Sequence, residues 1–305
     1  MGEEEDAAPF TRSSYKQTLI DQISGNLIAG DLTVKIHAAR EIRSLIRHHN
    51  SSHQIRAKFA SAGVIQPLVL MLYSRNHDAR HASLLAVLNL ASRNERNKEQ
   101  IVTSGAIPPL VDLLNSHTNT TLRELATAAI LTLSTAQPNK QTIINSGVIP
   151  LLVQILSCGT VQARVDAVTA LYNLTTSKQQ PTVTPDAKAI PPLINLLKEC
   201  KKSSKFAEKT TFLIKIVLKS EEGRLTITNT VDGILTLVET IEDGSLISTE
   251  HALTAYGTDQ GQDMARALLD LLRDSHPEKR PSSMVVEKMV HDIAARVDGL
   301  ENTGK

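Results

Sequence analysis

The strongest constraint on this chain is that its sequence repeats. One phrase, a glycine followed by an apolar residue and isoleucine and then by proline and leucine residues, recurs around Gly63, Gly105 and Gly147, which are spaced by 42 residues. Weaker copies begin at Lys188 and Asp232. A repeat of this length is typical of helical solenoids, in which each repeat packs against its neighbours and the stack offers a long surface to a partner. The repeat therefore predicts a binding protein and not an enzyme.

A second phrase recurs in phase with the first. It reads Ala-Val-Leu-Asn-Leu at 86–90, Ala-Ile-Leu-Thr-Leu at 129–133 and Ala-Leu-Tyr-Asn-Leu at 170–174. Two phrases that keep a constant offset over several cycles are hard to obtain by chance, so we interpret each cycle as one structural unit.

Residues 98–139 show what one cycle is expected to form. Gly105 follows a short helical stretch, where glycine tolerates the positive φ of a helix exit. Pro108 and Pro109 suit the first turn of a second helix, because the backbone N–H groups of that turn have no partner within the helix. A longer third helix is expected over 122–133, where leucines and alanines recur at three- and four-residue steps. The cycle therefore predicts three helices and an all-α chain.

This order of helices resembles the armadillo repeat. The likeness is carried by Gly-Ala-Ile-Pro-Pro-Leu-Val at 105–111 and by Ala-Leu-Tyr-Asn-Leu at 170–174. The resemblance implies a right-handed α-solenoid with three helices per repeat, consisting of about five full repeats and a truncated sixth over residues 15–256. We expect residues 1–14 to be a disordered acidic tail and residues 257–305 to form an irregular junction with C-terminal capping helices.

Motifs at 221–224, 242–245 and 268–275 resemble the armadillo domains of plant U-box ubiquitin ligases and of their relatives without a U-box. The resemblance implies two alternative functions. The first is a non-enzymatic scaffold that holds an extended segment of a partner, and the second is a substrate-recognition or regulatory module in a ubiquitin ligase pathway. About 15 residues precede the first repeat, too few for a U-box, so we expect no ligase activity from this chain. We expect its protein partner to be a kinase or a component of the ubiquitin pathway.

In the armadillo family the third helices line a concave groove, and an asparagine in the Ala-Leu-x-Asn-Leu phrase hydrogen-bonds the main chain of an extended peptide. The resemblance transfers this role to Asn89, Asn173 and the residues at the same phase in other repeats. Residues one helical turn earlier are expected on the same face. The alternative is that Asn89 and Asn173 bond the neighbouring repeat and serve packing alone. The full expected groove set is Arg40, Ser44, His81, Leu85, Asn89, Ala128, Thr132, Thr169, Asn173, Thr211 and Lys215.

Charge is unevenly distributed along the chain, although the net charge is only +1. Residues 35–100 hold 11 Lys/Arg against 4 Asp/Glu, whereas residues 217–305 hold 9 against 16. The basic end predicts an acidic peptide, a phosphoprotein segment or an anionic lipid headgroup as ligand, unless the charge only solvates the surface. Aromatic residues make up 3% of the chain, so we expect no specific binding of nucleic acid by base stacking. The predicted basic patch is Arg40, Arg43, Arg47, Arg56 and Lys58.

No other group of residues predicts chemistry. His77 and His81 are four residues apart, but no carboxylate or thiol stands at a matching spacing for a metal ion. Cys158 and Cys200 cannot form a disulfide framework, which favours the reducing cytoplasm or nucleus. No apolar run approaches the roughly 20 residues that span a bilayer. We therefore expect a monomer with no catalytic residue, metal, cofactor or membrane span.

Overall fold

The structure is a computed structural model, which describes residues 12–48, 52–116, 118–176 and 185–256. All regular elements in these ranges are helices: sixteen α-helices and two short 3₁₀ helices, without a strand in the described part of the chain. The all-α prediction is confirmed. The chain divides into two compact units, residues 1–181 (unit 1) and residues 182–305 (unit 2).

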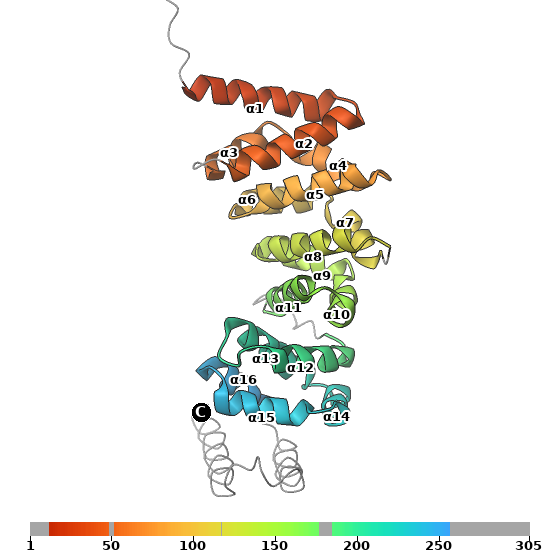
Figure 1. The fold of residues 1–305 in the computed structure, drawn as a ribbon, viewed down its shortest axis with the longest axis vertical. Coiled ribbons are helices and arrows are strands. Elements are labelled where there is room, and N and C mark those ends of the chain that lie inside the picture. Colours follow the sequence, from red (N-terminus) through yellow and green to blue (C-terminus); the bar gives the residue numbers. More distant parts are fainter. Residues whose placement is uncertain (1–11, 49–51, 117, 177–184, 257–305) are drawn as a thin grey trace, which may run out of the picture. The chain divides into compact units, whose positions relative to one another are not determined.

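Unit 1 begins with a helical pair and continues with three repeats, each with a short first helix, a second helix and a long third helix (Figure 1). The first helix begins at Arg12, so helical structure reaches slightly into the stretch expected as a tail. The pair is α1 (Arg12–Ala29) and α2 (Leu32–Arg47). The repeats are α3 (Ser52–Ser61), α4 (Ile65–Leu72) and α5 (His77–Ala91); α6 (Glu95–Thr103), α7 (Ile107–Asn115) and α8 (Thr120–Ser134); and η1 (Gln137–Asn139), α9 (Lys140–Asn145), α10 (Val148–Cys158) and α11 (Val161–Thr175).

Unit 2 repeats the same order twice within its described residues. The last helix begins at Leu246, where the repeat pattern predicts the third helix of a sixth repeat, and the predicted junction at 257–305 lies outside the described residues. The elements are η2 (Ala187–Ala189), α12 (Ile190–Glu199) and α13 (Lys205–Val217), then α14 (Glu221–Asn229), α15 (Gly233–Asp243) and α16 (Leu246–Tyr256).

The glycine phrase marks the turn between a first and a second helix. Gly63, Gly105 and Gly147 have φ values of 81°, 86° and 77°, in the left-handed region that disfavours a Cβ atom. In the weaker copy of the phrase, Asp232 takes this conformation with φ 56°, which aspartate tolerates better than most residues. The spacing of the repeated glycine in the sequence is therefore the spacing of a repeated backbone turn in the structure.

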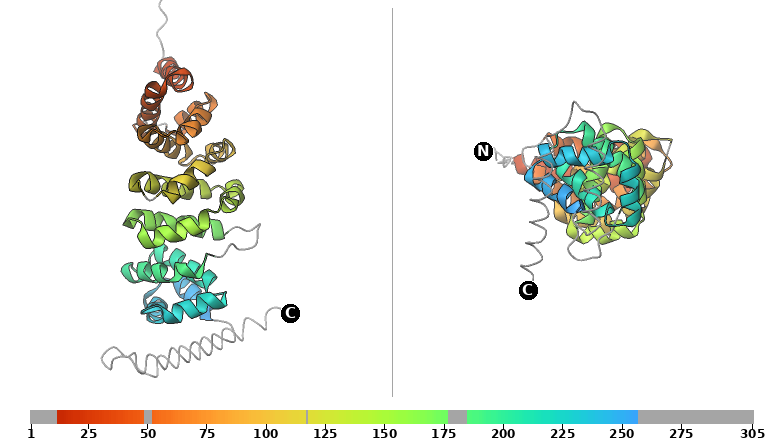
Figure 2. Two further views of the ribbon diagram at one scale, coloured as in Figure 1. Left: turned by 90° about the vertical axis from the view of Figure 1, so that its right-hand side faces the viewer. Right: turned by 90° about the horizontal axis from the view of Figure 1, so that it is seen from below.

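Helix α2 and the third helices of unit 1 pack side by side in chain order, α2 against α5, α5 against α8 and α8 against α11 (Figures 1 and 2). Helix α2 takes the place of a third helix at the start of this row. Small side chains allow this close approach, since Ala79, Ala82 and Ala86 of α5 are at most 2% exposed. A side-chain oxygen caps the N-terminus of each later third helix, which contributes about 1 kcal/mol per helix. The capping residues are Asn76, Asn119, Thr160 and Ser204.

Two buried asparagines, Asn97 and Asn139, join consecutive repeats, and we call them the asparagine clamps. The side-chain amide of Asn97 donates to the carbonyl of Leu90 at the end of α5 (3.0 Å) and to that of Arg56 in α3 (3.3 Å). Asn139 repeats this pattern 42 residues later. Its amide donates to the carbonyls of Leu133 and Lys98, both at 3.1 Å.

Each clamp therefore ties a first helix to the preceding first helix and to the end of the preceding third helix. Both asparagines are at most 3% exposed. Carbonyls in the last turn of a helix lack partners within that helix, and such groups are costly to bury unless something satisfies them.

We predict that Asn139→Ala lowers the free energy of unfolding by about 2 kcal/mol, because two buried hydrogen bonds are lost. Urea unfolding followed by circular dichroism measures the change. Asn145→Ala is the matched control, since Asn145 is exposed at the end of α9, the helix that follows Asn139, and its side chain bonds Gln141 alone among the described residues. Equal stability of the two variants would contradict a joining role for the clamp.

Candidate functional site

The third helices of unit 1 keep one stripe of residues partly exposed. On α5 this stripe contains His77, His81, Leu85 and Asn89 at four-residue steps, while most residues on the other sides of the helix are buried. Helices α8 and α11 carry matching stripes at the same phase, and α2 contributes its exposed residues at the N-terminal end. We call this surface, formed by the stripes of α2, α5, α8 and α11, the third-helix face.

The two predicted groove asparagines make different hydrogen bonds. The amide of Asn89 donates to the carbonyl of Leu85 in its own helix (2.7 Å). Within the described ranges, nothing donates a hydrogen bond to its side-chain oxygen. The amide of Asn173 donates to the buried hydroxyl of Ser134 on α8 (3.1 Å). Asn173 therefore joins two repeats, as the packing alternative expects, whereas Asn89 does not.

Threonines at the same face donate to their own helix. Thr132 bonds the carbonyl of Ala128 (2.8 Å) and Thr169 bonds that of Val165 (3.0 Å). Both threonines, together with Leu85 and Ala128, are half-buried, and Ser44 is exposed at the α2 end of the face. The hydroxyl oxygens of the threonines remain able to accept a hydrogen bond from a ligand.

Thr211 and Lys215 belong to unit 2. Thr211 is 1% exposed and bonds the carbonyl of Ala207 (2.7 Å). Its side chain is therefore not accessible to a ligand, and the prediction that Thr211 lines the groove is wrong. Lys215 is half-buried, and burial lowers its pKa, with Lys219 lowering it further and Glu250 raising it.

His81 lies among positive charges. Its ring stacks on that of His77 with a centroid distance of 6.1 Å. Burial lowers the pKa of His81, and His77, Arg43 and Arg40 lower it further, while Asp78 raises it. Each of these cations would repel an imidazolium, so this site disfavours the charged form of His81.

The arginines of the predicted basic patch have different surroundings. Arg40 and Arg43 act on His81 at the third-helix face, whereas the Nε of Arg56 donates to the carbonyl of Asn89 near the end of α5 (2.7 Å). Lys58 stands two residues after Arg56, and helical residues two apart point to different sides. Arg47 is exposed at the end of α2.

An acidic pair on the face was missed by sequence reasoning. Burial raises the pKa of Asp166 on α11, and the charge of Glu124 on α8 raises it further, while a hydrogen bond from Gln162 (2.8 Å) lowers it. Glu124 and Asp166 are 42 residues apart. The repeat length itself was the signal that could have placed these two carboxylates together.

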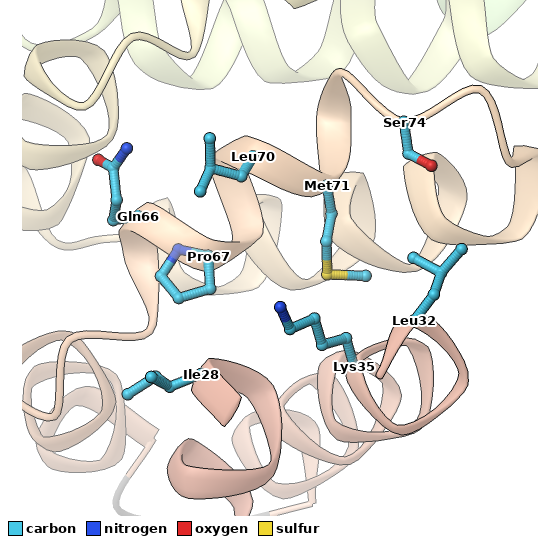
Figure 3. Close-up of a pocket in the computed structure, with 8 residues that line it drawn as sticks. All are labelled: Ile28, Leu32, Lys35, Gln66, Pro67, Leu70, Met71 and Ser74. Atoms are coloured by element: carbon cyan, nitrogen blue, oxygen red, sulfur yellow. The ribbon is translucent and has the colours of Figure 1, made fainter. Parts of the chain in front are cut away.

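A cavity of about 250 Å³ lies away from this face, where the turn between α1 and α2 meets α4 (Figure 3). Ile28 and Leu70, which line it, are 49% and 60% exposed. Lys35 reaches toward α4 and is the single ionisable residue among the eight that line the cavity. The lining therefore offers no acid–base pair.

Three further observations concern other kinds of site. Within the described ranges, no cluster of three or more His, Cys, Asp or Glu side chains has the geometry to hold a metal ion. Burial raises the pKa of the Cys200 thiol, while Cys158 is exposed. No single helix of the described chain is long and apolar enough to cross a membrane, although two bent helix pairs, His53–Ser61 with Ile65–Leu72 and Gln137–Asn145 with Val148–Cys158, reach that threshold together.

Comparison with known proteins agrees with this geometry. The family model of the armadillo/beta-catenin-like repeat matches residues 94–135 and 136–176, the two repeats that carry the asparagine clamps. The chain has the armadillo-repeat fold. Its similarity to solved structures extends over most of the armadillo-like region, and no curated protein matches it.

Several of the similar structures are designed or engineered proteins. A computationally designed armadillo repeat protein for modular peptide recognition is 20% identical, with a TM-score of 0.61 over 77% of this chain and 98% of that one. A designed armadillo repeat protein in complex with the peptide (KR)4 is 20% identical, with a TM-score of 0.58 over 77% and 97%. An engineered protein is 19% identical, with a TM-score of 0.64 over 93% and 70%.

We predict that Asn89→Ala and Asn173→Ala differ in stability. Asn89→Ala should change the free energy of unfolding by less than about 0.5 kcal/mol, because it removes one bond inside a helix and introduces a better helix former. Asn173→Ala should cost about 1 kcal/mol, because it removes a bond between two repeats. Urea unfolding of both variants tests this. A larger loss of unfolding free energy for Asn89→Ala than for Asn173→Ala would contradict the packing role of Asn173.

Proposed function

We propose that this protein is a non-enzymatic scaffold that holds an extended segment of a partner protein on the third-helix face of unit 1. The observation that carries the proposal is the alignment of half-buried polar side chains at one phase of three consecutive third helices, namely Asn89, Thr132 and Asn173. A row of amides and hydroxyls at a regular spacing suits the regular donors and acceptors of a peptide main chain.

The spacing of the helices fits such a ligand. Packed helix axes lie about 8–10 Å apart, and an extended chain advances about 3.3 Å per residue. One helix-to-helix step therefore corresponds to roughly three residues of an extended segment. Because of this match, a segment that crosses the helices can place a main-chain group near the polar residue of each helix.

The side-chain oxygens of the two asparagines support the same assignment. Among the described residues, the amides of Asn89 and Asn173 donate within the protein, but no donor reaches their oxygens. A half-buried acceptor without a partner can receive an N–H group from a ligand. The designed armadillo structure with its (KR)4 peptide supports a peptide as the ligand class.

A regulatory role in a ubiquitin ligase pathway is a second candidate, and it rests on the motifs at 221–224 and 242–245. Both glycines of these motifs have a packing reason. A Cβ atom on Gly223 would lie 2.2 Å from the carbonyl oxygen of Val217, and one on Gly244 would lie 2.1 Å from that of Thr240. The scaffold is therefore the function that the geometry favours, and we propose the cytoplasm or nucleus as its location on the basis of the two unpaired cysteines.

Site-specific photo-crosslinking tests the proposed surface. A photoreactive amino acid at Leu85 or Ala128 should capture a partner in cells that express the protein, whereas the same group at Tyr15, which is 67% exposed on α1, should not. Asn89→Ala should weaken the binding of the captured partner by about 2- to 12-fold, the equivalent of one hydrogen bond. Equal capture of the partner from Leu85, Ala128 and Tyr15 would contradict binding at the third-helix face.

A further inference from the structure

The charges on the third-helix face are sorted by sign. Arg40 and Arg43 of α2 lie beside His77 and His81 of α5, whereas the carboxylates of Glu124 and Asp166 lie on α8 and α11. We propose, on the basis of the function proposed above, that the partner segment carries charges of both signs, with acidic residues over α2 and α5 and a basic residue over α8 and α11. This narrows the expectation of a purely acidic ligand.

The positive end has more cations than its carboxylate can neutralise. Arg40 reaches the exposed Asp78 at 3.7 Å, and the same carboxylate lies 3.5 Å from His77. Arg43 is half-buried, and its Nε is buried with no partner among the described residues. The nearby carboxylate of Glu41 lies 3.3 Å from His37. An acidic group of a ligand would therefore find two arginines, of which Arg40 already pairs with Asp78.

At the negative end, no cation of the described chain forms an ion pair with the carboxylates. Glu124 and Asp166 come from adjacent helices and are half-buried close enough to interact electrostatically. Arg123 and Arg164 are their neighbours in sequence, but neither forms an ion pair with them in the described chain, and the charged group that acts on Asp166 is Glu124. A lysine or arginine of a ligand placed between the two carboxylates would relieve their repulsion.

The distance between the two ends sets the spacing of charges in the ligand. The point between α2 and α5 is two helix steps from the point between α8 and α11, or roughly 16–20 Å. An extended chain covers that distance in about five or six residues. The fitting segment therefore has its acidic and basic residues about five or six positions apart.

This arrangement disfavours ligands with charge of one sign. A vesicle of anionic lipid or a nucleic acid would be attracted to Arg40 and Arg43 but repelled by Glu124 and Asp166 on the same face. A protein segment with both charges can satisfy both ends.

Peptide binding tests the proposal. Four fluorescent 14-residue peptides are compared by anisotropy in low salt: one with two glutamates and two lysines five residues apart, one of the same composition with the four charges adjacent, one all-acidic and one all-basic. The wild-type protein should bind the spaced peptide at least about 10-fold more tightly than the others, the equivalent of about 1.4 kcal/mol. In the double variant Glu124→Gln with Asp166→Asn, the spaced peptide should bind no more tightly than the all-acidic peptide. In the double variant Arg40→Gln with Arg43→Gln, the spaced peptide should bind no more tightly than the all-basic peptide.

The outcomes separate this proposal from the proposed function. If every peptide binds equally and crosslinks at Leu85, the face binds segments but does not sort charge, and the proposal fails. If no peptide crosslinks at Leu85 or Ala128, both fail. Binding to phosphatidylserine vesicles is measured for the wild type and for the double variant Glu124→Gln with Asp166→Asn. Vesicle binding that is unchanged or weaker in the double variant would contradict the proposal and indicate a membrane surface as the ligand.

Stability provides a readout that does not depend on a ligand. The raised pKa of Asp166 means that its ionised form is disfavoured in the folded state, so its favourable contribution is present below the unfolded-state pKa and is lost as the pH rises through the folded-state pKa. We predict that Asp166→Asn increases the free energy of unfolding at pH 7 and that this gain shrinks at pH 3. Urea unfolding at the two pH values measures it, and a loss of stability at pH 7 would show that the carboxylate has a structural partner and is not held for a ligand.

Discussion

The structure depends on how the end of each third helix is satisfied where the chain turns back to start the next repeat. Carbonyls in the last turns of α5 and α8 lie there, and the residue four positions on, which would bond each of them in a continued helix, lies beyond the helix end. The asparagine clamps, Asn97 and Asn139, supply the missing donors and at the same time bond the preceding first helix. Without them, two consecutive repeats would meet at unpaired polar groups inside the core.

Once these ends are held, the third helices line up at a common phase, and this alignment creates the third-helix face. Residues that lie between helices, such as Ala79 and Ala86, must be small and buried. The residues of the exposed stripe point away from the neighbouring third helix, so that helix does not cover them and they stay partly exposed. The same packing that forms the core therefore produces a regular row of side chains for a partner.

The polar groups on that face are unequal. Asn173 uses its amide to hold α11 to α8, whereas the amide of Asn89 stays within α5. Asp166 is placed where burial and the charge of Glu124 disfavour its ionisation. Charges that oppose folding are a common cost of binding surfaces, and here they belong to the surface proposed to receive a cation.

Much of the fold followed from local chemistry that can be read along the chain. The 42-residue spacing of Gly63, Gly105 and Gly147 predicts three equivalent turns, and all three adopt positive φ. Pro108 and Pro109 open α7 as expected of residues without a backbone N–H group. These features depend on the residue itself and its nearest neighbours, so they can be predicted from the sequence.

The contacts between repeats could not be predicted in the same way. Asn89 and Asn173 stand in the same phrase but have different partners, because only α8 places a buried hydroxyl, Ser134, beside its neighbour's asparagine. Thr211 shares the phase of Leu85, yet it is buried in unit 2. Sequence determined which residues turn the chain and which belong to the core. The tertiary structure decided which polar side chains reach another helix and which remain for a partner, because that depends on the distance and rotation between helices about 40 residues apart.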